Sequence, residues 1–322
     1  MTISTATRPA PWAYAAPWGA RGYITDLDGP VHWIEFNADK NQGTTQNEPP
    51  IVFVHGLGGS HLNWCLLGPH LAADRRAVAL DLRGFGLTPG LRVNSTVQAN
   101  ARLLDRFING VVGEPVILVG NSMGGLISIL ETNNNPSMTR GVVLLDPALP
   151  LPLQKPDWQV SSQFLLYALP GLGELAVAKL LASVTPEQGV QQLLRLCFAD
   201  PSRADPEMIR AEVALGTKRH PATPAQASAR ARVFLAAARS LLRVLARRGN
   251  FQKMMAGIDV PVLLIGGEDD RLVPVAAMRQ VAARNPRWES VILAGVGHTP
   301  MLEVPDDTSA AIRDWLDRHF KS

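Results

Sequence analysis

The stretch Val116-Ile-Leu-Val-Gly120-Asn-Ser122-Met-Gly124-Gly125 decides the fold of this chain. Its β-favouring apolar residues lead directly into Gly-x-Ser-x-Gly, and an apolar segment of helical character follows. The two glycines that flank Ser122 permit a strained backbone and a close approach of strand to helix. Such a turn lifts the serine hydroxyl clear of a sheet and places it at a helix N-terminus, which favours negative charge. The stretch therefore predicts a buried strand and a candidate nucleophile.

The composition is that of an ordinary globular protein. The chain has 322 residues, of which 46% are hydrophobic and 18% charged, enough for one large domain with an insertion or for two domains. Its formal charge of +3 is mild, so nucleic acid is not an expected partner. Two cysteines, Cys65 and Cys197, form no disulfide framework and fit a reducing compartment.

The sequence also argues against targeting and metal-binding segments. The N-terminal residues lack the apolar core of a secretory signal, and no run of about 18 apolar residues is present. We therefore expect a soluble cytoplasmic protein. No clustered His and Cys spacing of the kind that binds metals appears, so neither a metal nor an organic cofactor is expected.

Strand and helix patterns alternate on both sides of the central stretch. Strands are predicted at residues 22–27, 31–37, 51–54, 76–80, 116–120, 141–145, 260–265 and 290–293. A capping box, Ser95-Thr-Val-Gln98, predicts the start of a helix that ends at Gly110. Residues 1–20 are expected to form a surface arm. The alternation predicts a mostly parallel twisted sheet with helices on both faces.

The alternation stops in the middle of the chain. Between residues 148 and 251 only helices are predicted, at 161–169, 172–183, 186–197, 206–216 and 224–247. We therefore divide the chain into a core, residues 1–147 and 252–322, and a helical cap, residues 148–251, inserted after the sixth predicted strand.

Several predicted strands end in loops that carry recognisable motifs. In chain order these loops are His55-Gly56-Leu57-Gly58-Gly59, Asp81-Leu-Arg-Gly-Phe-Gly86, the serine turn, Gly267-Glu-Asp-Asp270-Arg-Leu-Val-Pro274 and Gly297-His298. Taken together, they resemble those of serine hydrolases of the α/β-hydrolase-fold superfamily over nearly the whole length. That resemblance implies an α/β-hydrolase fold with an inserted helical lid.

The resemblance also implies a catalytic triad in the chain order Ser, Asp, His. Ser122 would be the nucleophile, and His298 the base that takes its proton. Asp270 lies four residues before Pro274, as the family's acid does, and would orient the imidazole. Asp146 follows the preceding strand and is the competing candidate, because some family members place the acid there.

The family builds its oxyanion hole from two backbone N–H groups, which here belong to Leu57 and Met123. Trp64 and Tyr167 are tentative substrate-binding residues, with loop packing as the alternative for Trp64. We interpret three other histidines as satisfied core or surface residues: His61, His70 and His220.

The cap suggests the kind of substrate. The segment 164–181 is unusually apolar, which fits packing onto the core, an apolar acyl pocket or a weak contact with a membrane surface. Arg232, Arg239 and Arg243 share one helical face, which we interpret as solvated; one of them turned inward could instead pair with a substrate carboxylate.

Three functions are open at this point. Ser122 excludes a resemblance to dehalogenases and epoxide hydrolases, which have aspartate there. Gly-Asn-Ser-Met-Gly-Gly is similar to the elbow of the meta-cleavage-product hydrolases, which cleave carbon–carbon bonds. Those enzymes usually have Trp where this chain has Thr299, and Gly-Pro-Gly in the first loop. We therefore expect a carboxylic-ester hydrolase for apolar or medium-sized esters, with the carbon–carbon hydrolase and a non-catalytic ligand-binding homologue as alternatives.

Overall fold

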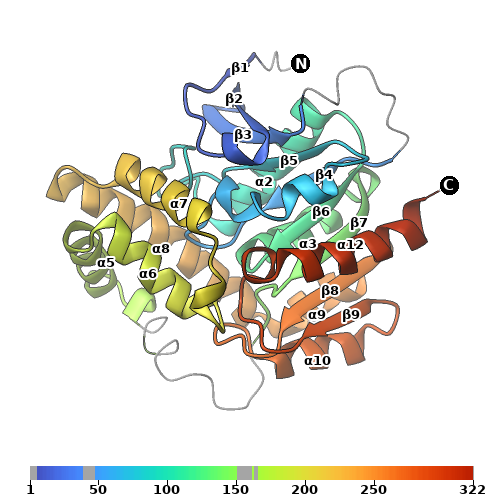
Figure 1. The fold of residues 1–322 in the computed structure, drawn as a ribbon. Coiled ribbons are helices and arrows are strands. Elements are labelled where there is room, and N and C mark those ends of the chain that lie inside the picture. The colour runs from blue at the N-terminus through green and yellow to red at the C-terminus, as the bar shows by residue number, and fades with distance from the viewer. Residues whose placement is uncertain (1–5, 39–47, 151–161, 163–165, 322) are drawn as a thin grey trace.

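The computed structural model describes residues 6–38, 48–150, 162 and 166–321. Its centre is one nine-stranded sheet with the strand order β1-β2-β3-β5-β4-β6-β7-β8-β9 (Figure 1). The strands are β1 (Thr7–Pro9), β2 (Ala20–Asp26), β3 (Pro30–Phe36), β4 (Ile51–Val54), β5 (Ala77–Leu80), β6 (Val116–Asn121), β7 (Thr139–Leu145), β8 (Val262–Gly267) and β9 (Glu289–Leu293).

The sheet is parallel from β5 to β9 and antiparallel at its N-terminal edge. β1, β2 and β3 form the antiparallel edge, and β3 joins the parallel part by pairing with β5. The carboxyl ends of the parallel strands meet at one edge of the sheet, where ligands bind in open α/β sheets. The predicted mostly parallel sheet is therefore confirmed.

Helices cover both faces of the sheet because the strands are apolar on both sides. Along β4, Val52 and Val54 belong to one core cluster, whereas Ile51 and Phe53 belong to the other. The helices of the core are α1 (Gly68–Leu71), α2 (Val97–Phe107), α3 (Met123–Asn134), α9 (Arg248–Ala256), α10 (Val275–Arg284), α11 (Pro300–Glu303) and α12 (Pro305–Phe320).

Between β7 and β8 the described residues form only helices. Four of them, α5 (Leu172–Ser183), α6 (Pro186–Cys197), α7 (Pro206–Arg219) and α8 (Pro224–Ala246), lie together to one side of the sheet in Figure 1. Arg239 of α8 bridges to Glu174 of α5 at 2.5 Å and donates to the Tyr167 carbonyl oxygen at 2.8 Å. The expectation of a wholly solvated arginine face is therefore wrong for Arg239.

Three local predictions need correction. The N-terminal arm contains β1, which extends the sheet by pairing with β2. Thr96, not Ser95, caps α2, since its hydroxyl accepts from the Ala99 N–H. The segment does not stop at Gly110 but continues through a π-turn, Ile108–Val112, to Gly113 in the left-handed conformation. Of the predicted helix at 161–169, residues 161 and 163–165 lie outside the described residues, and residues 166–168 are helical.

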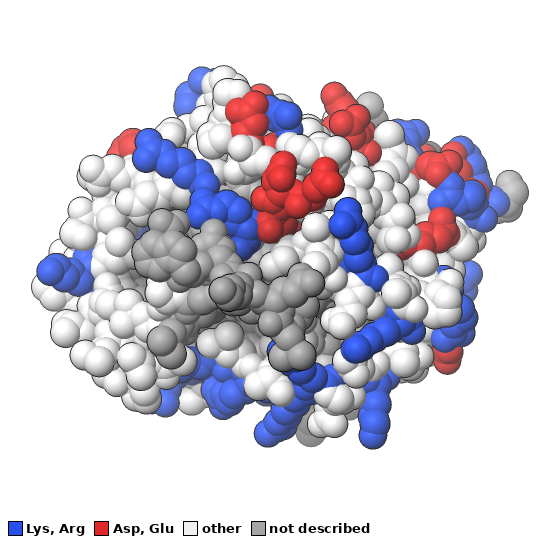
Figure 2. Space-filling view, turned by 90° about the horizontal axis from the view of Figure 1, so that it is seen from below, with Lys and Arg blue, Asp and Glu red and all other residues white. Residues whose placement is uncertain are grey.

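The charged side chains of the surface are scattered, as the small formal charge predicts. On the face drawn in Figure 2, Lys and Arg side chains stand singly or in small groups, with Asp and Glu among them. On this face the described residues form no continuous basic field. Within the described ranges, no helix is both long and apolar enough to cross a membrane.

Candidate active site

Ser122 lies between β6 and α3 in a strained backbone conformation. Its φ of 52° and ψ of −118° are unusual for a residue with a side chain. A Cβ at Gly120 would come within 2.6 Å of the Gly124 carbonyl oxygen, and a Cβ at Gly124 within 1.9 Å of the Val54 carbonyl oxygen. Both glycines are thus required by the tight packing of the turn, as the motif predicts.

His298 and Asp270 form a buried pair. The two residues lie on the loops that follow β9 and β8, and the Nδ1 of His298 is 2.7 Å from Oδ2 of Asp270. Oδ1 of Asp270 accepts from the N–H groups of Leu272 and Val273, at 2.7 and 3.0 Å. Because Nδ1 donates to the carboxylate, Nε2 is the acceptor nitrogen of the neutral imidazole.

Asn121 connects the serine turn with the histidine loop. Its side-chain amide, one residue before Ser122, donates to the carbonyl oxygen of His298 at 3.1 Å and to that of Leu145 at 3.0 Å. The residues 121 and 298 are therefore in direct contact although 177 positions separate them. Sequence reasoning did not single out Asn121, because the motif leaves that position open.

Asp146 lies beside this pair and interacts with the carboxyl of Asp270 and with the Gly267 N–H. It is fully buried, has a φ of 41°, and accepts from the Gly267 N–H at 3.0 Å. Burial, together with the neighbouring Asp270, raises the pKa of Asp146 well above its usual range. The carboxyl that meets the imidazole of His298 is that of Asp270.

The loop after β4, which carries Leu57, lies against the serine turn. A Cβ at Gly56 would come within 3.2 Å of the Ser122 Cβ, so loop and turn are in close contact at this point. Met123, the first residue of α3, is fully buried. The side chain of His55 supports the loop, since its Nε2 accepts from the Leu82 N–H at 3.0 Å. Burial lowers the pKa of His55 to about 4, which keeps this acceptor neutral.

This geometry agrees with the comparison with known families. Residues 51–311 match the model of the alpha/beta hydrolase family. The chain belongs to that family. It is a hydrolase by this membership, and its sheet and helices are those of the alpha/beta hydrolase fold.

Relatives of this alpha/beta hydrolase have several activities. It is 25% identical over 284 residues to the 2-hydroxy-6-oxo-6-(2'-aminophenyl)hexa-2,4-dienoic acid hydrolase of Metapseudomonas resinovorans, with 84% of each chain covered. It is 26% identical over 268 residues to the pimeloyl-[acyl-carrier protein] methyl ester esterase of Xanthomonas oryzae pv. oryzae, covering 83% of this chain and 95% of the other. A putative lipase from Acinetobacter baumannii has a similar fold, with a TM-score of 0.73, 20% identity and coverage of 96% and 97%.

The two tentative substrate-binding residues lie in different places. Trp64 of the hydrolase is fully buried in the core, where it stacks on Phe53 at a ring separation of 4.9 Å. This placement fits the packing interpretation of Trp64. Tyr167 lies in a small apolar cluster between α5 and α8, edge-on to Phe234 at 5.4 Å, and Leu57 packs against the same cluster. Of the two residues, Tyr167 is therefore the one that lies near the loop after β4, which carries Leu57.

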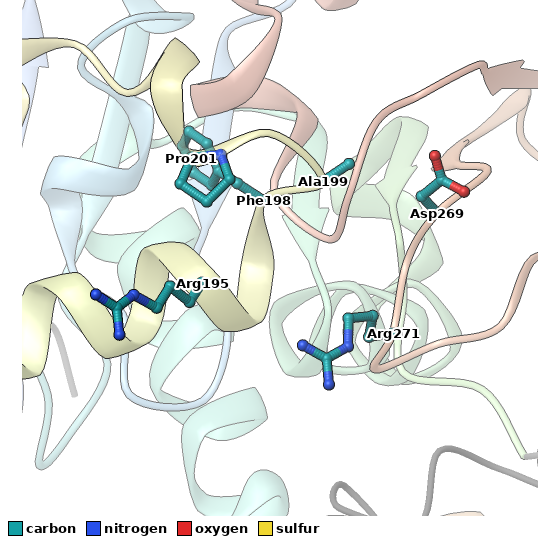
Figure 3. A pocket seen from close by; sticks show the side chains of 6 residues that line it. All are labelled: Arg195, Phe198, Ala199, Pro201, Asp269 and Arg271. Atoms are coloured by element: carbon teal, nitrogen blue, oxygen red, sulfur yellow. The ribbon is translucent and has the colours of Figure 1, made fainter.

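An open pocket of about 410 Å³ lies between the segment 195–201 and the loop after β8. Its lining comes from α6 and the segment after it on one side and from the loop after β8 on the other (Figure 3). The lining residues are Arg195, Phe198, Ala199, Pro201, Asp269 and Arg271. Asp269 and Arg271 flank Asp270 in the chain, but neither Asp270 nor His298 is among the residues that line the pocket.

A second His–Asp cluster lies after β5. The ligand atoms of His32, His61 and Asp81 are all within 4.8 Å of one another, a spacing that a metal ion would tolerate. The carboxylate, however, already accepts from Nδ1 of both histidines at 2.8 and 3.0 Å and from the N–H groups of His61 and Leu87 at 2.7 Å each. These donors occupy both oxygens, so we interpret the cluster as a hydrogen-bonded hub.

Proposed function

We propose that this alpha/beta hydrolase cleaves carboxylic esters of apolar or medium-sized substrates through an acyl-enzyme on Ser122. The observation that carries the proposal is the contact of His298 with Asp270 at 2.7 Å, on a loop that Asn121 ties to the serine turn. The strained backbone of Ser122 at the N-terminus of α3 supports its role as nucleophile.

In this mechanism His298 acts first as base and then as acid. Nε2 takes the proton of the Ser122 hydroxyl while Oγ of Ser122 attacks the ester carbonyl carbon. Asp270 stabilises the resulting imidazolium through its contact with Nδ1. The N–H groups of Leu57 and Met123 stabilise the oxyanion. His298 then protonates the leaving alkoxide, and a water activated by the same imidazole hydrolyses the acyl-enzyme.

Asp270 is supported as the acid of the triad over Asp146. The imidazole donates to Asp270, whereas the Asp146 carboxyl is held by the Gly267 N–H and has a raised pKa. A carboxyl whose pKa is raised stabilises an imidazolium less well than one that stays ionised.

The apolar cap supports the substrate class. The cluster around Tyr167 and Phe234 lies next to Leu57, whose N–H is proposed to face the oxyanion, so an acyl chain there would leave water for apolar surface. The esterase relative from Xanthomonas oryzae is consistent with an ester substrate.

Labelling with a fluorophosphonate probe tests the nucleophile. The native chain should be labelled and Ser122→Ala should not, and p-nitrophenyl butyrate should give a burst of nitrophenol with the native chain. Loss of the serine should reduce kcat by about 10⁴–10⁶-fold. Equal labelling of both chains would remove Ser122 from the mechanism and favour a ligand-binding role.

Carbon–carbon bond hydrolysis is the second candidate. The relative from Metapseudomonas resinovorans, which covers 84% of this chain, is named as the hydrolase of a hydroxy-oxo-dienoic acid, the kind of substrate that such enzymes cleave. Turnover of a vinylogous diketo acid, with no burst on p-nitrophenyl esters, would favour it over the ester hydrolase.

A further inference from the structure

The side chain of Glu303, at the end of α11, is completely buried between the cap and the histidine loop. A carboxylate in such a place needs hydrogen-bond donors to offset the loss of water. Sequence reasoning overlooked this residue because an acid near the C-terminus resembles a solvated surface charge. The sequence signal that could have identified Glu303 is its spacing: it lies five positions after His298, on the short helix that follows the histidine loop.

Four N–H donors from two segments point at this carboxylate. Oε2 accepts from the Gly297 N–H at 2.8 Å and from the Ala199 N–H at 3.1 Å. Oε1 accepts from the Asp200 N–H at 2.9 Å and from Nη1 of Arg203 at 3.3 Å. One side chain thus joins the cap segment after α6 to the residue that immediately precedes His298.

Further contacts connect the same two segments. The N–H of His298 donates to the Cys197 carbonyl oxygen at 2.6 Å, and Nη1 of Arg203 donates to the Gly295 carbonyl oxygen at 2.9 Å. A Cβ at Gly297 would come within 2.3 Å of the Cys197 oxygen, so the two backbones approach too closely for any side chain there. Figure 3 shows Phe198, Ala199 and Pro201 of this cap segment opposite the loop that carries Asp269.

We propose that Glu303 is a positioning residue that locks the cap segment 197–203 to the loop 295–298 and thereby holds the imidazole of His298 in line with Ser122. The inference rests on the proposed function for its effect on catalysis, and on geometry alone for the lock. Bonds to Gly297 and Ala199 through one oxygen make the positions of the two segments interdependent. The pocket lined by Phe198 and Ala199 then keeps a fixed position relative to His298.

Glu303→Gln tests the lock with little change of volume. Its carbonyl oxygen can replace one carboxylate oxygen, whereas its NH₂ group faces N–H donors and cannot accept from them. Because misplacement by about 1 Å can cost about 100-fold in rate, kcat for p-nitrophenyl butyrate should fall about 10- to 100-fold. The Nδ1–H signal of His298 in the proton NMR spectrum should broaden or shift.

Hydrogen exchange supplies a readout that does not depend on catalysis. In Glu303→Gln the peptides covering 197–203 and 294–299 should exchange faster together, while those covering β4 and β6 should not change. Arg203→Met, which removes one donor and the bond to Gly295, should show the same pattern more weakly. Arg203→Met also provides a test of the lock if Glu303→Gln fails to fold.

The matched control is Glu131→Gln. Glu131 is another fully buried carboxyl group, on α3, and its oxygens have no hydrogen bond to either segment of the lock. Burial raises its pKa to about 8. Its kcat and both exchange patterns should stay near those of the native chain. A Glu303→Gln protein with native kcat, or with faster exchange in only one of the two segments, would overturn the proposal. If Ser122→Ala retained full activity, the proposed function would fail while the exchange result still decided the lock.

Discussion

Asp270 and Asp81 both follow buried parallel strands, and each lies 2.7–2.8 Å from a histidine Nδ1. Their surroundings differ. Asp270 accepts from one imidazole and from two N–H groups of its own turn, whereas Asp81 joins two imidazoles and two N–H groups from separate loops. Asp270 therefore orients one ring, and Asp81 holds several segments together.

The partners of the histidines differ as well. His298 is tied through its carbonyl oxygen to Asn121, beside the strained Ser122. His32 and His61 instead pack against each other, with ring centroids 4.7 Å apart. A buried His–Asp contact is thus common to both sites. Only the site of His298 has the strained Ser122 nearby, and that serine is what indicates a catalytic role there. The comparison predicts that the two carboxylates fail in different ways when they are altered.

The largest effect is expected from Asp270→Asn. The amide leaves the volume unchanged but favours the wrong imidazole tautomer, so kcat should fall about 10⁴-fold. The melting temperature should change little. Steady-state kinetics and calorimetry on the same preparation check both. A variant that retains native kcat would move the acid to Asp146, and the double variant with Asp146→Asn would then be the inactive one.

Asp81→Asn should show the opposite pattern. The change removes the charge that four donors share in a buried site, which typically costs about 3 kcal/mol or more of unfolding free energy. Urea unfolding measures this loss, and fluorophosphonate labelling of the folded fraction should stay near native. A stable but unlabelled variant would contradict a purely structural role.

Acid titration sharpens the same contrast. Burial alone would raise the pKa of Asp81, but His61 and His32 lower it well below its ordinary value. A carboxyl with a depressed folded-state pKa stabilises the protein fully above its unfolded pKa of about 4, and this stability is lost as the pH falls through the folded value. Between about pH 4 and pH 2 the native chain should therefore lose more unfolding free energy than Asp81→Asn. Parallel curves would mean that Asp81 adds nothing to acid stability.

The smallest effect is expected at Leu57. Its proposed contribution is a backbone N–H, which Leu57→Ala retains, so turnover should slow by far less than the roughly 100- to 1,000-fold that follows loss of an oxyanion donor. A chain-length series of p-nitrophenyl esters separates the effect on turnover from the loss of apolar contact. If the variant cleaved every ester about 100-fold more slowly than the native chain, the substitution would have displaced the loop itself.

Much of the framework was predictable from local patterns. The strand β4 begins and ends at the predicted residues, because a short apolar run bounded by Pro50 and His55 has few alternatives. The start of α2 was misplaced by one residue, since Ser95 and Thr96 are equally good caps in sequence. β1 was missed because three exposed residues have no apolar pattern, and only pairing with β2 makes them a strand.

The sequence by itself determined the strand, turn and helix around Ser122, because Gly-x-Ser-x-Gly acts through backbone sterics within a few residues. It also indicated His298 and Asp270 through their resemblance to a family. Only the tertiary structure decided that Asp270 rather than Asp146 meets the imidazole and that Glu303 joins the segment after α6 to the histidine loop. The partners of Glu303 lie between 6 and 104 positions away from it along the chain, and hydrogen bonds over such separations depend on how the loops pack.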